Sequence, residues 1–207
     1  RYGRDKTFAV PIMTNAALAG IVPWHKVSPL PFELSCLPQW LYRYLRLPVV
    51  SYAIPALVGV GQARFFHRPP LNPVTRFIRG LAVERSLRVV QEMQPDGGGF
   101  LEAAPLTSFV VMSLASIGRI DHPIVRLGTQ FLVSSVRPDG SWPIDTNLAT
   151  WNTSLCIQAL SSDPFGQSRD WLGDDCLDWL LSCQHRQAHP FTGAAPGGWA
   201  WTDASGG

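Results

Sequence analysis

The chain has 207 residues, of which 46% are hydrophobic and 15% are charged, and its formal net charge is +2. A charged fraction well below the usual value of about 25% favours a protein that buries much of its surface or contacts an apolar medium. The small net charge gives no basis for a nucleic-acid partner, and we expect none.

Proline divides the first 80 residues into short segments, because its ring fixes φ and it cannot donate a backbone hydrogen bond. It also disfavours helical geometry at the residue before it. We expect short helices at 10–20, 31–45 and 49–62, and a connector at 67–73. Residues 1–80 are the first of two expected units.

The most apolar run of the chain covers residues 47–60 and is interrupted by Pro48 and Pro55. It is shorter than the roughly 20 residues that a membrane-spanning helix needs. We favour a buried helix, and a membrane-facing interfacial helix is the alternative. The alternative rests on flanking arginines, namely Arg43, Arg46, Arg64 and Arg68.

The second unit, residues 81–207, contains one pattern three times: a short apolar helix, a polar turn and a Gly-x-aromatic end. The ends are Gly98-x-Phe100, Gly140-x-Trp142 and Gly197-x-Trp199. Gln94 and Gln184 precede the first and third turns, whereas Val136 precedes the second. The third copy carries an insertion at 185–196, and further helices are expected at 107–118 and 150–162. A recurring helix–turn–helix unit predicts an all-α fold of stacked helix pairs.

The Gly-x-aromatic turns resemble the QW repeats of the class II triterpene cyclases, the squalene–hopene cyclase family. Other segments carry the same resemblance: Phe8–Met13 (FAVPIM), Leu30–Tyr42 (LPFELSCLPQWLY), Trp151-Asn152-Thr153 and Gly197–Trp201 (GGWAW). The resemblance covers nearly all of the chain. It implies α/α toroids, that is, helical barrels with Gly-x-Trp turns, of which this chain holds parts of two.

The resemblance also implies an isomerase chemistry without a cofactor or a metal. A carboxylic acid protonates a linear, squalene-like polyene, and aromatic faces stabilise the resulting cations while the chain closes to a polycyclic, hopanoid-type triterpene. Such an enzyme is monotopic on the cytoplasmic face of a bacterial membrane, where it takes up its hydrophobic substrate. A homodimer is compatible with the resemblance.

Site residues carry over from the resemblance position by position. Trp151 and Trp201 match aromatic residues that line the substrate pocket, and Asn152 stands where the family has Asp. Pro105 matches a pocket-wall proline, and Ala103 and Ala104 replace larger wall residues. The repeat residues are expected to staple helix ends, namely Gln94, Gly98, Phe100, Gly140, Trp142, Gln184, Gly197 and Trp199.

The family's proton-donating Asp-x-Asp-Asp motif does not occur in the sequence, and we expect it just after Gly207. The chain is therefore interpreted as a fragment that is inactive alone. Two alternatives stay open. Asp174-Asp175-Cys176 has an order similar to the zinc ligands of protein prenyltransferase β subunits, and a non-catalytic α/α-barrel scaffold is the other. His185 and His189 have zinc-ligand spacing, but the Pro190 that follows argues for a loop without metal.

Overall fold

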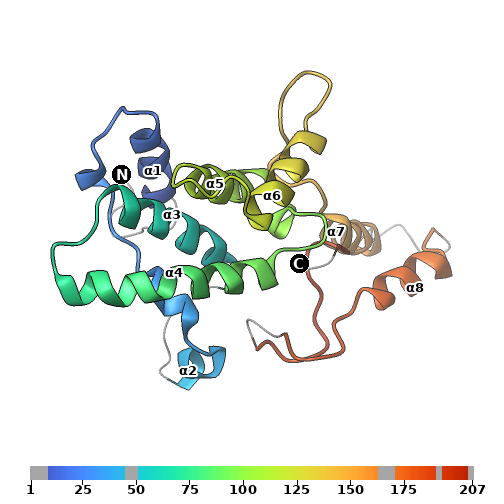
Figure 1. Cartoon of the computed structure of the whole chain (residues 1–207). Coiled ribbons are helices and arrows are strands. Elements are labelled where there is room, and N and C mark those ends of the chain that lie inside the picture. Colours follow the sequence, from blue (N-terminus) through green and yellow to red (C-terminus); the bar gives the residue numbers. More distant parts are fainter. Residues whose placement is uncertain (1–8, 45–50, 163–170, 190–192, 205–207) are drawn as a thin grey trace.

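The computed structural model describes residues 9–44, 51–162, 171–189 and 193–204, and in these ranges the chain is almost entirely helical (Figure 1). Its elements are α1 (Ala9–Leu18), η1 (Trp24–Lys26), η2 (Phe32–Cys36), α2 (Gln39–Tyr44), η3 (Ser51–Ala53), α3 (Ile54–His67), α4 (Pro73–Met93), η4 (Phe100–Glu102), α5 (Ala104–Ala115), α6 (Pro123–Ser134), α7 (Ala149–Ser161) and α8 (Asp174–Ser182). The described ranges contain no strand, only one isolated antiparallel bridge between Ala103 and Asp145. The all-α fold class is confirmed.

The helix expected at 31–45 is divided into η2 and α2. Leu37, the residue before Pro38, has φ −81° and ψ 145°, which is extended backbone. A proline disfavours helical geometry at the preceding residue, so the helix cannot continue through this point. The helix expected at 49–62 corresponds to α3, which begins later, at Ile54, and extends to His67; residues 49 and 50 lie outside the described ranges.

The longest helix, α4, is a single element that includes the short apolar helix expected before the first Gly-x-aromatic end. Its start is fixed by Asn72, whose Oδ1 accepts hydrogen bonds from the backbone N–H groups of Val74 and Thr75. Pro73 occupies the first helical position, where its missing N–H costs nothing. The expected boundary between the units, at residue 80, falls inside this helix.

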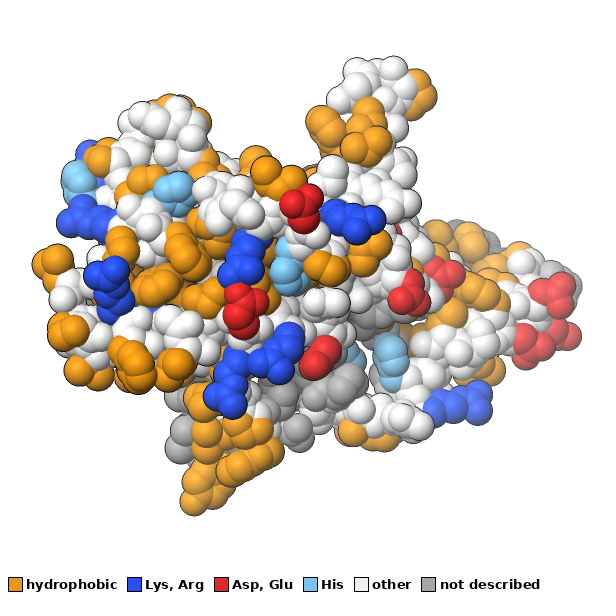
Figure 2. Space-filling model, in the orientation of Figure 1, with side chains coloured by type: hydrophobic (Ala, Val, Ile, Leu, Met, Phe, Trp, Pro, Cys, Tyr) orange, Lys and Arg blue, Asp and Glu red, His pale blue; other side chains and the backbone are white. Residues whose placement is uncertain are grey.

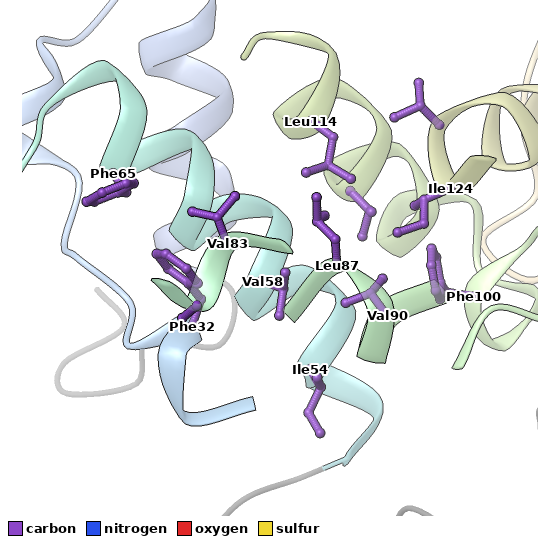
Figure 3. Packing of buried hydrophobic residues seen from close by; sticks show 13 residues of the cluster. Phe32, Ile54, Val58, Phe65, Val83, Leu87, Val90, Phe100, Leu114 and Ile124 are labelled. Carbon is purple, nitrogen blue, oxygen red and sulfur yellow. The ribbon is translucent and has the colours of Figure 1, made fainter. Parts of the chain in front are cut away.

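The hydrophobic core lies where α3 packs against α4 and α5, with η2 and α6 closing its sides (Figure 3). Its fully buried side chains include Phe32, Val58, Leu87, Phe100, Val110, Leu114 and Ile124. Two polar contacts are also buried there. Gln62 Nε2 donates to Val83 O at 3.0 Å, and Arg79 Nε pairs with the Glu33 carboxylate at 3.1 Å, which ties η2 to α4.

The apolar run that suggested a membrane-facing helix is buried in its described part, with Ile54 and Val58 in this core and Val60 in a second cluster against α1. Ile54, Val58 and Val60 of α3 are each at most 3% exposed. No helix in the described ranges combines the length and the hydropathy required to cross a bilayer.

Two helices, α7 and α8, lie far from α1, at the other side of the molecule in Figure 1. Thr150 is the one buried residue of α7, and α8 has no buried residue. Their apolar side chains, which include Leu155, Leu160 and Leu181, are exposed in this structure. The helix that follows the second turn and the helix that precedes the third are thus far less buried than α4.

Candidate functional site

The three Gly-x-aromatic turns share a local geometry. Gly98, Gly140 and Gly197 have φ values of 83°, 79° and 103°, a region that favours glycine. The two tryptophans are anchored in the same way: Trp142 Nε1 donates to Leu132 O at 2.7 Å, and Trp199 Nε1 donates to Leu180 O at 2.6 Å. Each acceptor lies four residues before the position occupied by Val136 or Gln184. The local geometry of these turns therefore recurs.

The glutamines close two of these turns. Gln94 Nε2 donates to Gly98 O at 2.9 Å and to Ile124 O at 3.1 Å, so it joins the first turn to the start of α6. Gln184 Nε2 donates to Gly197 O at 3.0 Å. Val136 has no side-chain donor, and the second turn lacks this hydrogen bond.

The aromatic rings differ in burial. Phe100 is 2% exposed and belongs to the hydrophobic core, whereas Trp142 and Trp199 are 52% and 43% exposed. A phenylalanine has no ring N–H that requires an acceptor, so it enters an apolar core without cost. The indoles of Trp142 and Trp199 instead donate to backbone carbonyls of α6 and α8, the helices before their turns.

The two tryptophans predicted to line a pocket are in contact. The rings of Trp151 and Trp201 are parallel to within 8°, with centroids 5.9 Å apart, which is an offset stack. Trp151 is 47% exposed. Trp201 Nε1 is buried and has no hydrogen-bond partner in the described structure. In the pair, the ring N–H of Trp201 is therefore shielded from solvent, while Trp151 presents an exposed indole surface.

The stack is held by hydrogen bonds between the first turn of α7 and the segment that follows Trp199. Trp151 N donates to Trp201 O at 3.2 Å, and Thr150 Oγ1 donates to Ala200 O at 2.6 Å. The first N–H groups of a helix have no partner within the helix. Trp201 O thus satisfies an N–H group that α7 leaves unpaired.

The predicted wall residues lie at the start of α5. Ala103 forms the antiparallel bridge with Asp145, and Ala104 N donates to Ile144 O at 3.0 Å. Ala104 is buried, and Pro105, in the first turn of α5, is exposed. These contacts hold the start of α5 against residues 144–146, the loop that leads into α7.

A strained turn precedes this wall. Leu101 and Glu102 have φ values of 55° and 57°, a region that costs a residue with a side chain roughly 1–2 kcal/mol. Thr146 compensates part of this cost, because its N donates to Glu102 O at 2.8 Å and its Oγ1 donates to the Glu102 carboxylate. The turn and the loop before α7 therefore hold each other in place.

The structure brings the predicted site residues together in two groups. Trp151 and Trp201 form one, and Ala103, Ala104 and Pro105 form the other. Neither a hydrogen bond nor a ring contact joins the two groups directly in the described structure; the loop at 144–147 connects them. Asn152 is exposed on α7.

Four residues that hold this arrangement were not singled out from the sequence: Glu102, Thr146, Asn147 and Asp203. The residue type of Asn147 is itself a local signal, because an asparagine before a helix favours a turn in which its side chain accepts from the backbone N–H two residues on. Its Oδ1 accepts from Ala149 N at 2.9 Å. The other three have no local signature, since their roles depend on tertiary contacts and on an unusual backbone conformation.

The residues considered for metal binding do not form a ligand set in the described structure. The His185 and His189 rings are in edge-to-face contact, with centroids 6.3 Å apart. Burial, with a smaller effect from His185, lowers the pKa of His189. Asp174 and Asp175 form the first turn of α8. The described residues contain no group of three or more His, Cys, Asp or Glu side chains that could hold a metal ion.

An open cavity of about 650 Å³ lies over α6 and the loop before it, away from the residues predicted for the site. Its lining is formed by Ile120, Asp121, Val125, Arg126, Thr129, Gln130, Val133 and Ser134. A single helix and its preceding loop provide all of these side chains, so the cavity has no opposing wall to enclose a ligand.

No protein-family model matches this chain, and no curated protein matches it.

Proposed function

We propose that the chain is part of a class II terpene cyclase, with Gly-x-aromatic turns that belong to α/α toroids. The observation that carries this proposal is the parallel Trp151–Trp201 pair. The two residues are 50 positions apart in the sequence, and the family resemblance assigns both of them to one substrate pocket. The recurring anchors of Trp142 and Trp199 support the toroid part of the proposal.

The proposed chemistry requires surfaces that stabilise a carbocation without trapping it. An indole face attracts a cation with about 0.5–2 kcal/mol, and it offers no nucleophilic lone pair comparable to that of a hydroxyl or carboxylate group. Burial of Trp201 Nε1 keeps the polar atom of that ring away from solvent. The pair thus supplies an apolar, electron-rich surface for a squalene-like polyene.

Two acidic side chains of the candidate site act as hydrogen-bond acceptors in the described structure. Glu102 accepts from Thr146, and Asp203 accepts from Asn147. An acid that starts the reaction must instead donate its proton to an alkene. We therefore place the general acid elsewhere, in the Asp-x-Asp-Asp motif expected just after Gly207.

We also propose a monotopic association with a membrane, through α4 rather than through the buried α3. Its outward face carries apolar side chains that are all at least half exposed: Val74, Phe77, Ile78 and Leu81, with Leu71 just before the helix. Their spacing places them on one side, opposite the buried Val83, Leu87 and Val90. Figure 2 shows this apolar surface over the N-terminal half of α4.

Positive charge borders the apolar face of α4. Arg68, Arg76, Arg85 and Arg88 are exposed. Glu84, which lies on the same side of the helix, pairs with Arg119. A convex apolar face with a cationic border fits the interface of an anionic bilayer, into which apolar side chains insert while arginines reach the phosphates. From there a polyene could pass directly from the lipid to the enzyme.

The proposed activity is tested with the full-length protein and squalene in detergent. We expect wild-type protein to form polycyclic products, and Trp151→Ala to consume substrate while releasing prematurely terminated products. Trp171→Ala removes another exposed indole outside the site and is expected to leave the product pattern unchanged. An unaltered product pattern for Trp151→Ala would refute the cation-stabilising role. Stoichiometric zinc in the protein would instead favour the prenyltransferase alternative, and no conversion at all would favour the scaffold.

A further inference from the structure

The Trp151–Trp201 stack depends on a contact between the start of α7 and the segment that contains Trp201. The side chain of Asn147 bonds to both. Asn147 Oδ1 accepts from Ala149 N at 2.9 Å, at the start of α7. Its Nδ2 donates to Asp203 Oδ1 at 2.7 Å, two residues beyond Trp201. Asn147 therefore contacts the two segments that carry the two rings.

Only a side chain with both a donor and an acceptor can make these two bonds at once. An aspartate at position 147 keeps an acceptor for Ala149 N, but it cannot donate to Asp203 and places a second negative charge beside it. A serine keeps a cap for the helix and is too short for both contacts. The amide is therefore specific for this pair of partners.

Asn147 also follows directly after the loop that is joined to the wall residues. Thr146 donates to Glu102 through its backbone N–H, at 2.8 Å, and through its hydroxyl. A displacement at position 147 would change both the stack and the link between the stack and Ala103. The position thus connects both groups of the candidate site.

We propose that Asn147, with Asp203 as its partner, is the positioning residue that sets the placement of Trp201 against Trp151. The inference deepens the proposed cyclase function, in which the placement of the two rings selects the cation that is stabilised. Asn147 acts through the two tryptophans and does not itself contact the substrate.

The placement of the rings is measured by 19F NMR of the full-length protein labelled with 5-fluorotryptophan. Trp151→Phe and Trp201→Phe variants assign the two resonances. We expect Asn147→Asp to shift both resonances and to leave those of the other tryptophans unchanged. Asp203→Asn alone should shift neither, because an asparagine carbonyl can still accept from Asn147 Nδ2.

The double variant Asn147→Asp with Asp203→Asn is the decisive test. It exchanges donor and acceptor, so the new amide at position 203 can donate to the new carboxylate at position 147, which still accepts from Ala149 N. We expect it to restore both resonances to their wild-type positions. Gln158→Glu makes the same amide-to-carboxylate change on the exposed side of α7 and should shift neither. If Asn147→Asp does not fold, Asn147→Ser and the double variant provide the same comparison.

Wild-type resonances in Asn147→Asp, or a folded double variant that fails to restore them, would overturn the inference. Product analysis adds a second measurement: we expect Asn147→Asp to change the product ratio and the double variant to restore it. If the wild-type protein converts no polyene, the proposed function fails while the NMR result still decides the role of Asn147. An unchanged product ratio with shifted resonances would show that the ring placement does not control the reaction, and would overturn that part of the inference.

Discussion

The aromatic residues of the three turns differ in one group: the two tryptophans have a ring N–H, and the phenylalanine has none. The indoles of Trp142 and Trp199 donate to backbone carbonyls and stay half-exposed, whereas the ring of Phe100, which has no such donor, lies in the core. The sequence pattern treats the three positions as equivalent. Their burial differs because the chemistry of the ring decides whether it needs a partner.

The turn glycines allow a matched comparison at the residue scale. Gly98 and Gly140 have nearly equal φ values, 83° and 79°, so alanine carries the same backbone strain at both positions. At Gly98 the added Cβ would lie 2.4 Å from Leu127 O, while at Gly140 nothing lies within 4 Å. We expect Gly140→Ala to lower the free energy of unfolding by about 1 kcal/mol, and Gly98→Ala to cost about 2 kcal/mol more.

Chemical denaturation of the two alanine variants beside wild type measures this difference. Equal losses at both positions would contradict the close approach of the first turn to α6. The comparison separates backbone strain from steric overlap, since only the second differs between the two sites.

The same scale shows where prediction from sequence stops. The roles of Gly98 and Gln94 could be predicted, because their residue types and spacing recur along the chain. The positive φ of Leu101 and Glu102 could not, because neither residue type favours it and tertiary contacts with Thr146 hold it. Asp203 is similar: its partner, Asn147, is remote in sequence.

At the scale of elements, helix starts differ in the residue that caps them, and α6 uses a titratable one. His122 Nδ1 accepts from Ile124 N at 3.3 Å. Burial, and secondarily the positive charge of Arg119, lowers the pKa of His122 below its usual 6.5, against a smaller opposing effect of Glu84. The folded protein therefore favours the neutral ring, which is the form that can accept this hydrogen bond.

This cap gives the stability of the fold a pH dependence with a definite sign. As the pH falls below the usual pKa of 6.5, the unfolded chain binds more protons at His122 than the folded protein, so the free energy of unfolding decreases. Above that pKa the contribution is fully present. His122→Asn, which caps without titrating, should weaken the loss of stability on acidification.

Urea unfolding between about pH 8 and about pH 5 tests this expectation. His25→Asn, at an exposed histidine of η1, serves as the matched control. A His122→Asn variant with the same dependence on pH as the His25→Asn variant would show that the cap does not contribute.

The helices themselves were predictable in type, while their lengths were not. The start of α4 depends on Asn72 and Pro73, which are a cap and a first helical residue that the pattern had assigned to a connector. The interruption before α2 follows from Pro38, which disfavours helical geometry at Leu37 and so divides 31–45. Local signals for both ends were present in the sequence.

At the scale of the whole molecule, the position of the exposed apolar surface on α4 could not be predicted from the amino-acid composition. The sequence favoured a buried helix for 47–60, and the described part of that run, from Ile54 onward, is helical and largely buried. It contained no indication that an exposed apolar surface would lie on 71–81, because Arg76 and Arg79 interrupt that stretch. Only the packing of α3, between α4 and α5, shows which faces are covered.

The proposed lipid contact of α4 is tested by sedimentation with phosphatidylcholine vesicles, with and without phosphatidylglycerol. We expect the full-length protein to bind the anionic vesicles, and Phe77→Glu to release it, because a carboxylate would enter the apolar interface. Val133→Glu, at a residue that is 68% exposed on α6 compared with 67% for Phe77, is the matched control. Phe77→Glu that binds like wild type would exclude this face, and capture of another protein by it would indicate a protein partner instead.

In the third turn, two backbone hydrogen bonds close the base of the inserted loop. His185 N donates to Gly198 O at 2.9 Å, and Gly197 N donates to His185 O at 2.7 Å. Trp199 donates to Leu180 O outside the inserted loop. Trp142 makes the corresponding hydrogen bond to Leu132 O in the second copy, which has no insertion. The ring is thus anchored by a hydrogen bond outside the inserted residues, and each doubling of a loop's length adds only about 0.6 kcal/mol to its closure cost. The loop is therefore a graft point, where an epitope or a reporter could be added to the protein without disturbing its helices.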